Sequence, residues 1–275
     1  MKILYMGSCA YDSIPAPFCT CRVCRNALKM GGKELRSRTQ TLINDDLLIE
    51  FNSDSISHFH KYLIDTTKIK TCLITHSHSD HLYVEDIVIP QYSLSSSSCD
   101  FYCGEDSFNR INQALDTCAE PIKTRDYIKL HLIAPNQKFE TNGYHIQTFR
   151  GNHDVKASPI FYAIEKDGKR ILYAHDTGVF YDEVYDELKD TKPFDLISLD
   201  CTGGLATQGW YDGHMRVATV QIVIDKLRDM KLINDNTKIV LNHFCHNGFA
   251  THEELVEATK DLGYIISYDG LEIEI

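Results

Sequence analysis

The sequence lacks any apolar run long enough to cross a membrane. Its first apolar segment, Ile3–Met6, ends at Gly7 and is also too short for the hydrophobic region of a secretory leader. No other targeting segment is visible. We therefore expect a cytoplasmic protein that has no membrane partner.

Basic residues are also scarce. The 28 Lys and Arg residues are outnumbered by 39 Asp and Glu residues, which gives a formal net charge of −11. A protein that holds nucleic acid through a broad face needs the opposite balance, so nucleic acid is not expected as a partner. An anionic small molecule stays compatible with this acidity, because a bound metal pair would dominate the local electrostatic field.

Internal repeats, long charge runs and Pro- or Gly-rich linkers are absent as well. The only biased stretch is the serine-rich segment Ser93–Ser98, which we interpret as a surface loop. Apolar residues make up 43% of the chain, enough for a substantial core. A single domain over residues 1–275 is the simplest organisation.

Short strands outnumber helices along the chain. The expected strands are Lys2–Met6, Gln40–Ile43, Leu47–Phe51, Thr71–Thr75, Tyr144–Arg150, Ile160–Glu165, Ile171–Ala174, Leu196–Asp200, Lys238–Asn242 and Leu271–Ile275. The expected helices are Asp106–Cys118, Tyr181–Leu188, Met215–Met230 and Thr251–Leu262. The segment Lys166–Lys169 predicts a hairpin turn, and Thr251 with Glu254 has capping-box spacing. This order favours sheets packed face to face and covered outside by helices.

The densest group of potential metal ligands follows the strand expected at 71–75. It has the sequence HSHSDH and spans His76–His81. His76 and His78 alternate, so an extended segment points both rings to one side, where they can bind one ion. Asp80 and His81 follow, and they can turn toward a second ion. Imidazole with carboxylate is the ligand mixture expected for Zn, Fe or Mn.

Three later residues repeat one pattern, in which a donor side chain stands just beyond the end of an expected strand. His153 follows the strand that ends near Arg150, Asp176 follows Ala174, and His243 follows Asn242. Taken singly, each would more often be an ordinary loop or core residue than a ligand. Their repetition predicts a shared metal site.

These seven residues resemble the full ligand set of the metallo-β-lactamase superfamily. The resemblance implies an α/β fold, the αββα four-layer sandwich, over essentially the whole chain. It also implies two divalent metals at a catalytic site, Zn or Mn, with Fe as a further candidate. The implied ligands are His76, His78 and His153 on one metal, Asp80, His81 and His243 on the other, and Asp176 as the bridge.

The sequence departs from the superfamily pattern after the early strands. Many relatives have an Asp-x-Gly turn there that supports the ligands, whereas this chain has the segment Leu48–Asp54. Glu50 and Asp54 are the two alternatives for the supporting carboxylate.

A second candidate metal site is the C-x-C-x-x-C cluster formed by Cys19, Cys21 and Cys24. Cysteines this close are poorly placed to form disulfides with one another. Three thiolates suit a tetrahedral structural zinc that lacks its fourth ligand. That zinc would hold the loop near residues 19–24 in place. His246, three residues after His243, is the natural fourth ligand, and Cys245 is its competitor. We interpret the other thiols as buried or inert.

The cysteine cluster with His246 also resembles a narrower subgroup, the phosphoribosyl cyclic phosphate phosphodiesterases of the carbon–phosphorus lyase pathway. In that group three N-terminal cysteines and a C-terminal histidine hold a structural zinc beside the two-metal site. The resemblance implies a phosphodiesterase that hydrolyses a small cyclic or nucleotide-like phosphate ester, with attack by a metal-bridging hydroxide.

His214 is the candidate that assists the leaving group. Related phosphodiesterases and tRNA-processing nucleases have a histidine at this point, and the ordinary pKa of histidine suits the donation of a proton. Asp200 would orient His214 or simply end its strand, and Asp80 is assigned to the catalytic set as well as to the ligands. The alternative for His214 is a residue that caps the following helix.

Other functions remain open from the sequence alone. A thioesterase or lactonase would use the same metals without needing His214, and a tRNA-processing nuclease is disfavoured by the acidic charge. A zinc-stapled interaction module without catalysis is disfavoured because no expected ligand is missing. The expected partner is a small phosphate ester, and a homodimer is an assembly that the sequence leaves open.

Overall fold

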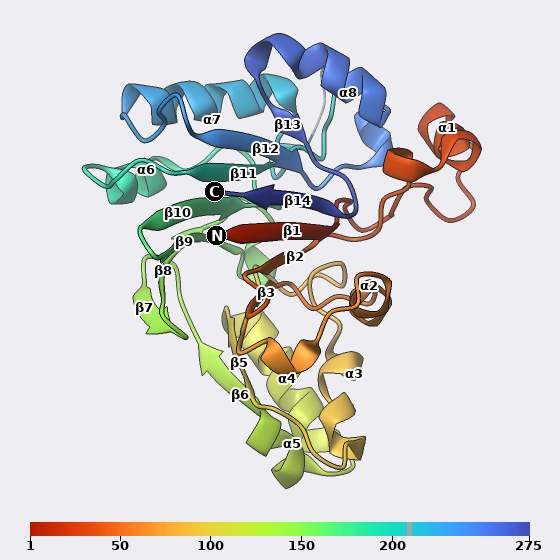
Figure 1. The fold of residues 1–275 in the computed structure, drawn as a ribbon, viewed down its shortest axis with the longest axis vertical. Helices are drawn as coiled ribbons and strands as arrows, with labels where there is room; N and C mark the ends of the chain where they lie inside the picture. Colours follow the sequence, from red (N-terminus) through yellow and green to blue (C-terminus); the bar gives the residue numbers. More distant parts are fainter. Residues whose placement is uncertain (208–210) are drawn as a thin grey trace.

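The computed structural model describes residues 1–207 and 211–275. These residues form two seven-stranded sheets that pack face to face, with helices on both outer faces (Figure 1). The two termini lie side by side, because β1 (Lys2–Gly7) pairs antiparallel with β14 (Leu271–Glu274). The expected αββα four-layer sandwich is confirmed.

Each sheet contains a run of parallel strands. In the first sheet, ordered β14-β1-β2-β3-β4-β5-β6, the strands from β3 to β6 run parallel. Its remaining members are β2 (Gln40–Ile43), β3 (Leu47–Ile49), β4 (Thr71–Leu73), β5 (Cys99–Cys103) and β6 (Ile128–Leu132). Because the carboxyl ends of parallel strands meet at one edge of a sheet, side chains that follow these strands gather there.

The second sheet has the order β13-β12-β11-β10-β9-β8-β7, and its strands from β10 to β13 run parallel. Its members are β7 (Lys138–Thr141), β8 (Tyr144–Arg150), β9 (Ile160–Lys166), β10 (Lys169–Ala174), β11 (Leu196–Asp200), β12 (Lys238–Asn242) and β13 (Ile265–Ile266). Segments after β10, β11 and β12 therefore also share one edge.

The helices form the two outer layers. On the outer face of the first sheet, toward the lower right of Figure 1, lie α2 (Ser55–Lys61), α3 (Val84–Ile87), α4 (Glu105–Thr117) and α5 (Pro121–Tyr127). Above the second sheet lie α6 (Asp182–Leu188), α7 (Val217–Asp229) and α8 (His252–Thr259). Helix α1 (Arg22–Met30) projects to one side. No helix of the described residues combines the length and the apolar character that a membrane crossing requires.

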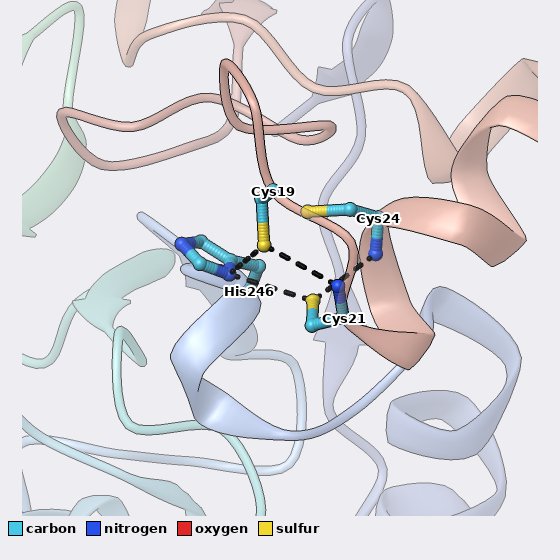
Figure 2. A group of neighbouring side chains, drawn as sticks. All are labelled: Cys19, Cys21, Cys24 and His246. Atoms are coloured by element: carbon cyan, nitrogen blue, oxygen red, sulfur yellow. Dashed lines mark hydrogen bonds between the residues drawn. The ribbon is translucent and has the colours of Figure 1, made fainter.

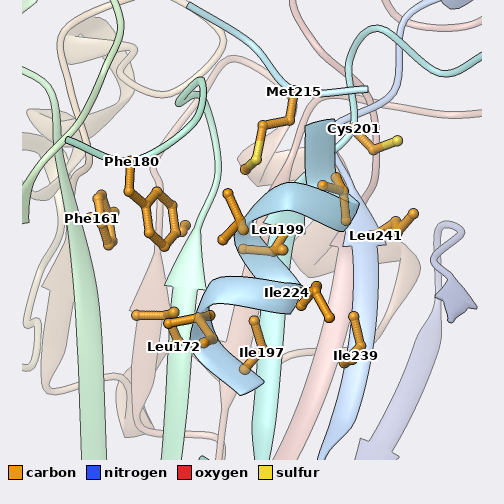
Figure 3. Packing of buried hydrophobic residues seen from close by; sticks show 14 of the residues in the cluster. Phe161, Leu172, Phe180, Ile197, Leu199, Cys201, Met215, Ile224, Ile239 and Leu241 are labelled. Carbon is orange, nitrogen blue, oxygen red and sulfur yellow. The ribbon is translucent and has the colours of Figure 1, made fainter. Parts of the chain in front are cut away.

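Three apolar clusters fill the three spaces between the four layers. Side chains such as Tyr5, Ile146 and Val240 pack between the two sheets. Another cluster, with Leu48 and Ile111, lies between the first sheet and its helices. The third lies under α6, α7 and α8. In it, Ile224 of α7 faces residues of β10, β11 and β12, including Leu172, Ile197, Leu199, Ile239 and Leu241 (Figure 3).

Most expected elements are present with small shifts at their ends. The predicted hairpin turn is confirmed, since Lys166 and Lys169 face each other across it and Asp167 and Gly168 adopt positive φ. The capping box of Thr251 and Glu254 is also confirmed. The predicted helix from Met215 begins at Val217 instead. The elements that the expectation omitted are β5, β6, β7, β13, α1, α2, α3 and α5.

Replacing Ile224 by Ala should lower the free energy of unfolding by roughly 2–5 kcal/mol, because it leaves a cavity under α7. Ile222, on the same helix, has 55% of its surface exposed. Ile222→Ala should therefore change stability by no more than about 0.5 kcal/mol. Urea denaturation of both variants checks this, and equal losses would show that α7 does not pack as described.

Candidate metal centre

Seven potential ligands from both halves of the chain meet at one edge of the sandwich. His76 lies three residues beyond the end of β4. Asp176 lies two residues beyond the end of β10, and His243 lies one residue beyond the end of β12. His153 lies three residues beyond the end of β8, at the same edge. The sequence pattern of donors beyond strand ends therefore corresponds to a real convergence of side chains.

The first group of donors comprises His76, His78, His153 and Asp176, whose ligand atoms all lie within 4.8 Å of one another. His78 Nδ1 is 2.9 Å from His76 Nε2 and 3.2 Å from His153 Nε2. His76 Nε2 lies 3.1 Å from Asp176 Oδ2. Three ring nitrogens and a carboxylate oxygen thus face a common point.

The second group comprises Asp80, His81, Asp176 and His243, all buried. His81 Nε2 is 2.7 Å from Asp176 Oδ2 and 3.2 Å from Asp80 Oδ2. His243 Nε2 lies 3.7 Å from Asp176 Oδ2 and 3.6 Å from Asp80 Oδ2. Asp176 belongs to both groups, and its carboxylate therefore stands between them.

Several buried atoms of these groups have no hydrogen-bond partner. Among the described residues, His81 Nε2, His243 Nε2 and Asp176 Oδ1 are in this position. His81 Nε2 is close to a carboxylate oxygen, but the two do not have the geometry of a hydrogen bond. Leaving buried polar atoms unsatisfied costs roughly 1–3 kcal/mol each. Divalent cations would satisfy all three atoms, so the donor set fits the metals that the fold implies.

The imidazole nitrogens that point away from the donor groups have partners of their own. His76 Nδ1 contacts Thr75 Oγ1 at 3.0 Å, and His153 Nδ1 donates to the Gly213 carbonyl at 3.0 Å. His243 Nδ1 lies 2.8 Å from Thr202 Oγ1. Such contacts fix the orientation and tautomer of a metal-binding imidazole. Thr75 and Thr202 have no sequence signature for this role, because hydroxyls near strand ends are common.

The carboxylate that supports the ligand loop is Glu50. It is fully buried, its Oε1 lies 3.1 Å from His81 Nδ1, and its Oε2 accepts from the backbone N–H of Thr75. Asp54, the other alternative, instead accepts from the backbone and guanidinium of Arg38. Of the two alternatives, Glu50 is therefore the one that contacts the ligand loop.

Three residues of the centre have left-handed backbone conformations. Glu50, Asp176 and His243 have φ values of 73°, 52° and 61°. Non-glycine residues rarely adopt this region, and each such residue costs on the order of 1–3 kcal/mol. The surrounding packing must hold these residues in place. Strain of this kind is concentrated in functional sites.

The buried carboxylates and imidazoles of the centre shift one another's pKa values. Burial by itself would raise the pKa of Asp176, but the imidazoles of His243, His214 and other neighbours outweigh burial and hold that pKa far below its ordinary range. Burial, with the nearby His81, lowers the pKa of His76 to about 3. Burial also opposes protonation of His243, yet Asp176 and Asp200 raise its pKa to about 9. Burial and the neighbouring carboxylates therefore act on the pKa values of these imidazoles in opposite directions.

His214 lies beside the two donor groups. Its Nδ1 is 2.9 Å from Asp176 Oδ1 and 3.2 Å from Asp200 Oδ2. Burial lowers the pKa of His214, but these two carboxylates reverse the effect and raise it to about 11. Asp200 is itself fixed by the backbone N–H of Met215 at 2.8 Å. The predicted pairing of Asp200 with His214 is thus present in the structure.

Gly178 and Gly213 allow the His214 loop to lie this close. A Cβ at Gly178 would stand 1.8 Å from the Asp212 carbonyl, and one at Gly213 would stand 2.3 Å from the Tyr211 ring. The backbone contact at Gly178 excludes a side chain larger than hydrogen, whereas the exposed Tyr211 ring can turn away from one at Gly213.

The cysteine cluster forms a separate group of donors (Figure 2). Cys19, Cys21, Cys24 and His246 have their ligand atoms within 4.8 Å of one another. His246 Nδ1 lies 3.5 Å from both Cys19 Sγ and Cys21 Sγ. A tetrahedral zinc with bonds of about 2.0–2.3 Å requires donor separations of roughly 3.5 Å, so the geometry fits.

His246, rather than Cys245, faces the cluster. Cys245 Sγ points to Asp12 at 3.6 Å, and Asp12 also lies 3.5 Å from His246 Nε2. Asp12 thus supports the imidazole from behind. Hydrogen bonds from neighbouring groups outweigh the effect of burial and lower the pKa of Cys21 to about 6. A thiolate is the form that binds metal.

Comparisons with known proteins agree with this arrangement. A family model described as the β-lactamase superfamily domain matches residues 54–263. That range includes the seven ligand candidates and His214 but excludes the three cysteines. No curated protein matches the sequence.

Solved structures share the whole fold. Zinc-bound PqqB from Methylobacterium extorquens has a TM-score of 0.76 and 17% identity, with 100% of both chains covered. A diphosphatase of the PhnP family has a TM-score of 0.73 and 18% identity over 100% of this chain and 97% of that one. The short form of human tRNase Z has a TM-score of 0.66 and 16% identity over 100% and 99%. Identities this low show a common fold alone. The family match covers well over half of the sequence, and the chain therefore belongs to the β-lactamase superfamily, with the metallo-β-lactamase fold.

Proposed function

We propose that the protein is a metal-dependent phosphodiesterase that hydrolyses a small cyclic or nucleotide-like phosphate ester. The observation that carries this proposal is the position of His214, which contacts Asp176 at 2.9 Å beside both donor groups. A thioesterase or lactonase with this fold does not need such a histidine. The acidic charge of −11 favours a small ester over a nucleic acid.

Two divalent cations, Zn or Mn with Fe as a further candidate, would be held by the seven candidate ligands, with Asp176 shared. When bound, they would supply a hydroxide near neutral pH and neutralise charge on the phosphoryl oxygens. All members of the second group are buried, which limits competition from bulk water there, while His78 and His153 of the first group are partly exposed. Asp80 contributes to catalysis through its place in the second group.

His214 would donate the proton that the departing oxygen needs. Asp176 and Asp200 both face His214 Nδ1, which leaves Nε2 as the nitrogen available to the substrate. The same two carboxylates favour the protonated ring, and a protonated imidazole is a general acid. Asp200 positions the ring and does not itself reach the substrate.

A structural zinc at Cys19, Cys21, Cys24 and His246 completes the proposal. Its support is the donor spacing and the low pKa of the Cys21 thiol. This zinc would join the N-terminal loop to the segment that follows β12.

A panel of substrates tests the activity. We expect turnover of bis-p-nitrophenyl phosphate and of a cyclic phosphate, and little turnover of a thioester or a lactone. Rapid thioester cleavage without phosphodiester cleavage would overturn the proposal, as would tight retention on immobilised tRNA at physiological salt.

Replacing Asp176 by Asn should remove at least one catalytic metal and abolish turnover, because both donor groups lose their shared carboxylate. Metal content per chain by mass spectrometry and phosphodiesterase rate are the measurements. Asp182→Asn, at a side chain that is 94% exposed, is the control and should change neither. Retention of both metals with normal activity would contradict the assignment.

Replacing His214 by Ala should lower kcat by about 10²–10⁴-fold and leave metal content unchanged, because the general acid is lost while all seven ligands remain. The control is His145→Ala, at an exposed histidine paired with Glu140 on another part of the surface. Steady-state kinetics with the cyclic phosphate measure the effect. Unchanged kcat would remove His214 from the mechanism.

Replacing Cys21 by Ser should reduce bound zinc by one ion per chain and lower the stability more than the chemistry, since a structural zinc contributes folding free energy directly. The loss should exceed the roughly 0.5 kcal/mol that is typical of surface substitutions. Cys118→Ser, outside the cluster, is the matched control. Wild-type thermal stability and zinc content in Cys21→Ser would show that the cluster binds no zinc.

A further inference from the structure

A groove of about 800 Å³ opens next to the ligand motif. One end is formed by Ser79, an exposed residue between the candidate ligands His78 and Asp80. From there the groove runs between α4 on one side and α3 with the following turn η3 (Ile89–Tyr92) on the other. Figure 1 shows these helices together beneath the first sheet. Ser79 therefore places this end of the groove beside the ligand motif, while the candidate ligands themselves are not among the lining residues.

The shape of the groove is held by hydrogen bonds across it. Arg110 of α4 donates to the carbonyl of Ser77 in the ligand motif at 3.1 Å. At the far end, the buried Gln91 of η3 accepts from the backbone N–H of Ala119 at 2.6 Å. The carbonyl of Gln91 also accepts from Lys123 at 3.0 Å. The groove is thus preformed, which reduces the entropic cost of binding.

The lining combines polar side chains with apolar and aromatic ones. Leu82, Val88 and Ala114 supply the apolar surface, while Tyr83 and Tyr92 supply aromatic rings with hydroxyls. Tyr92 has 75% of its surface exposed, far more than a tyrosine that serves the core. Aromatic faces beside an apolar surface suit a planar ring, above all a nucleobase, which stacks on such side chains.

The charges along the groove disfavour a second phosphate group. Its only cationic lining residue is Arg110, and that guanidinium already lies 3.1 Å from the Asp106 carboxylate. Glu85 adds a negative charge. An anionic substituent would find no free cation among the lining residues, whereas an uncharged one meets no such penalty.

From these features we infer that the groove binds the larger, uncharged and ring-bearing ester group of the substrate, of the nucleoside class, while the phosphate lies at the metal centre. This inference rests on the proposed phosphodiesterase activity and narrows it. A cyclic sugar phosphate without a base would leave most of the 800 Å³ unfilled. The substrate class is thus a nucleoside phosphodiester rather than a small sugar cyclic phosphate.

Two esters with the same leaving group test the inference. Thymidine 5′-(p-nitrophenyl) phosphate and methyl p-nitrophenyl phosphate both release p-nitrophenolate. A difference between their KM values therefore comes from the group that stays on the phosphate, thymidine or methyl. We expect the wild type to have a KM that is lower by roughly ten-fold for the thymidine ester, as expected for one stacked base.

Ala114→Trp, which places a bulky ring in the groove, should raise KM for the thymidine ester by roughly ten-fold and leave the methyl ester within two-fold. Asn109→Trp adds the same bulk on α4 outside the groove and should change neither value. Tyr92→Ala removes an exposed ring that the fold does not require, so it tests the same point if the tryptophan disturbs folding. It should also raise KM for the thymidine ester alone.

The outcomes separate the two proposals. If the wild type turns over both esters but Ala114→Trp and Tyr92→Ala change both KM values equally, or change neither, the groove is not the site of the larger group and the phosphodiesterase proposal stands. If the wild type turns over neither ester, the phosphodiesterase proposal fails, and the groove assignment fails with it.

Discussion

A single buried carboxylate shared by two groups of donors is the constraint on which the structure depends. Asp176 is 3% exposed and approaches His76 and His81 at 3.1 and 2.7 Å. An unpaired charge at such a depth costs several kcal/mol even after the protein relaxes. It is tolerated only where partners converge on it from every side. Strands of both sheets must therefore end at the same edge of the sandwich as Asp176. The loops that follow these strands must place imidazole rings within reach of its carboxylate.

The supporting contacts follow from the same constraint. Asp200 accepts from the backbone N–H groups of Asp176 and Met215, and its carboxylate contacts the rings of His214 and His243. It therefore joins the ends of β10, β11 and β12 to the turn before α7. Glu50, Asp176 and His243 keep their strained backbone conformations because the surrounding contacts stabilise these positions by more than the positive φ angles cost.

The sequence predicts features that depend on neighbouring residues, such as the ends of strands. It does not predict features that depend on contacts between residues far apart in the chain. Donors that follow strands were identifiable because β4, β10 and β12 are short apolar runs with clear ends. Strand β5 was missed because Asp100 interrupts its apolar pattern and it follows a serine-rich loop. The choice of Glu50 over Asp54 depends on which carboxylate meets His81, and linear spacing contains no information on that contact.

The two candidate metal sites are linked through one short piece of backbone. His243 faces the second donor group, and His246, three residues later, faces the cysteines. Between them, Phe244 accepts from Ala10 and donates to Ser8, so the N-terminal loop is anchored to this segment on both sides. Gly248 packs against Gly204, and the backbone N–H of the neighbouring Gly203 donates to the carbonyl of Met215, next to His214. A zinc that fixes His246 would therefore restrain His243 and the His214 turn through the backbone, without any contact with the substrate. Under the proposed function, such a coupling would let a cysteine cluster that lies outside the family match support the candidate ligands without being one of them.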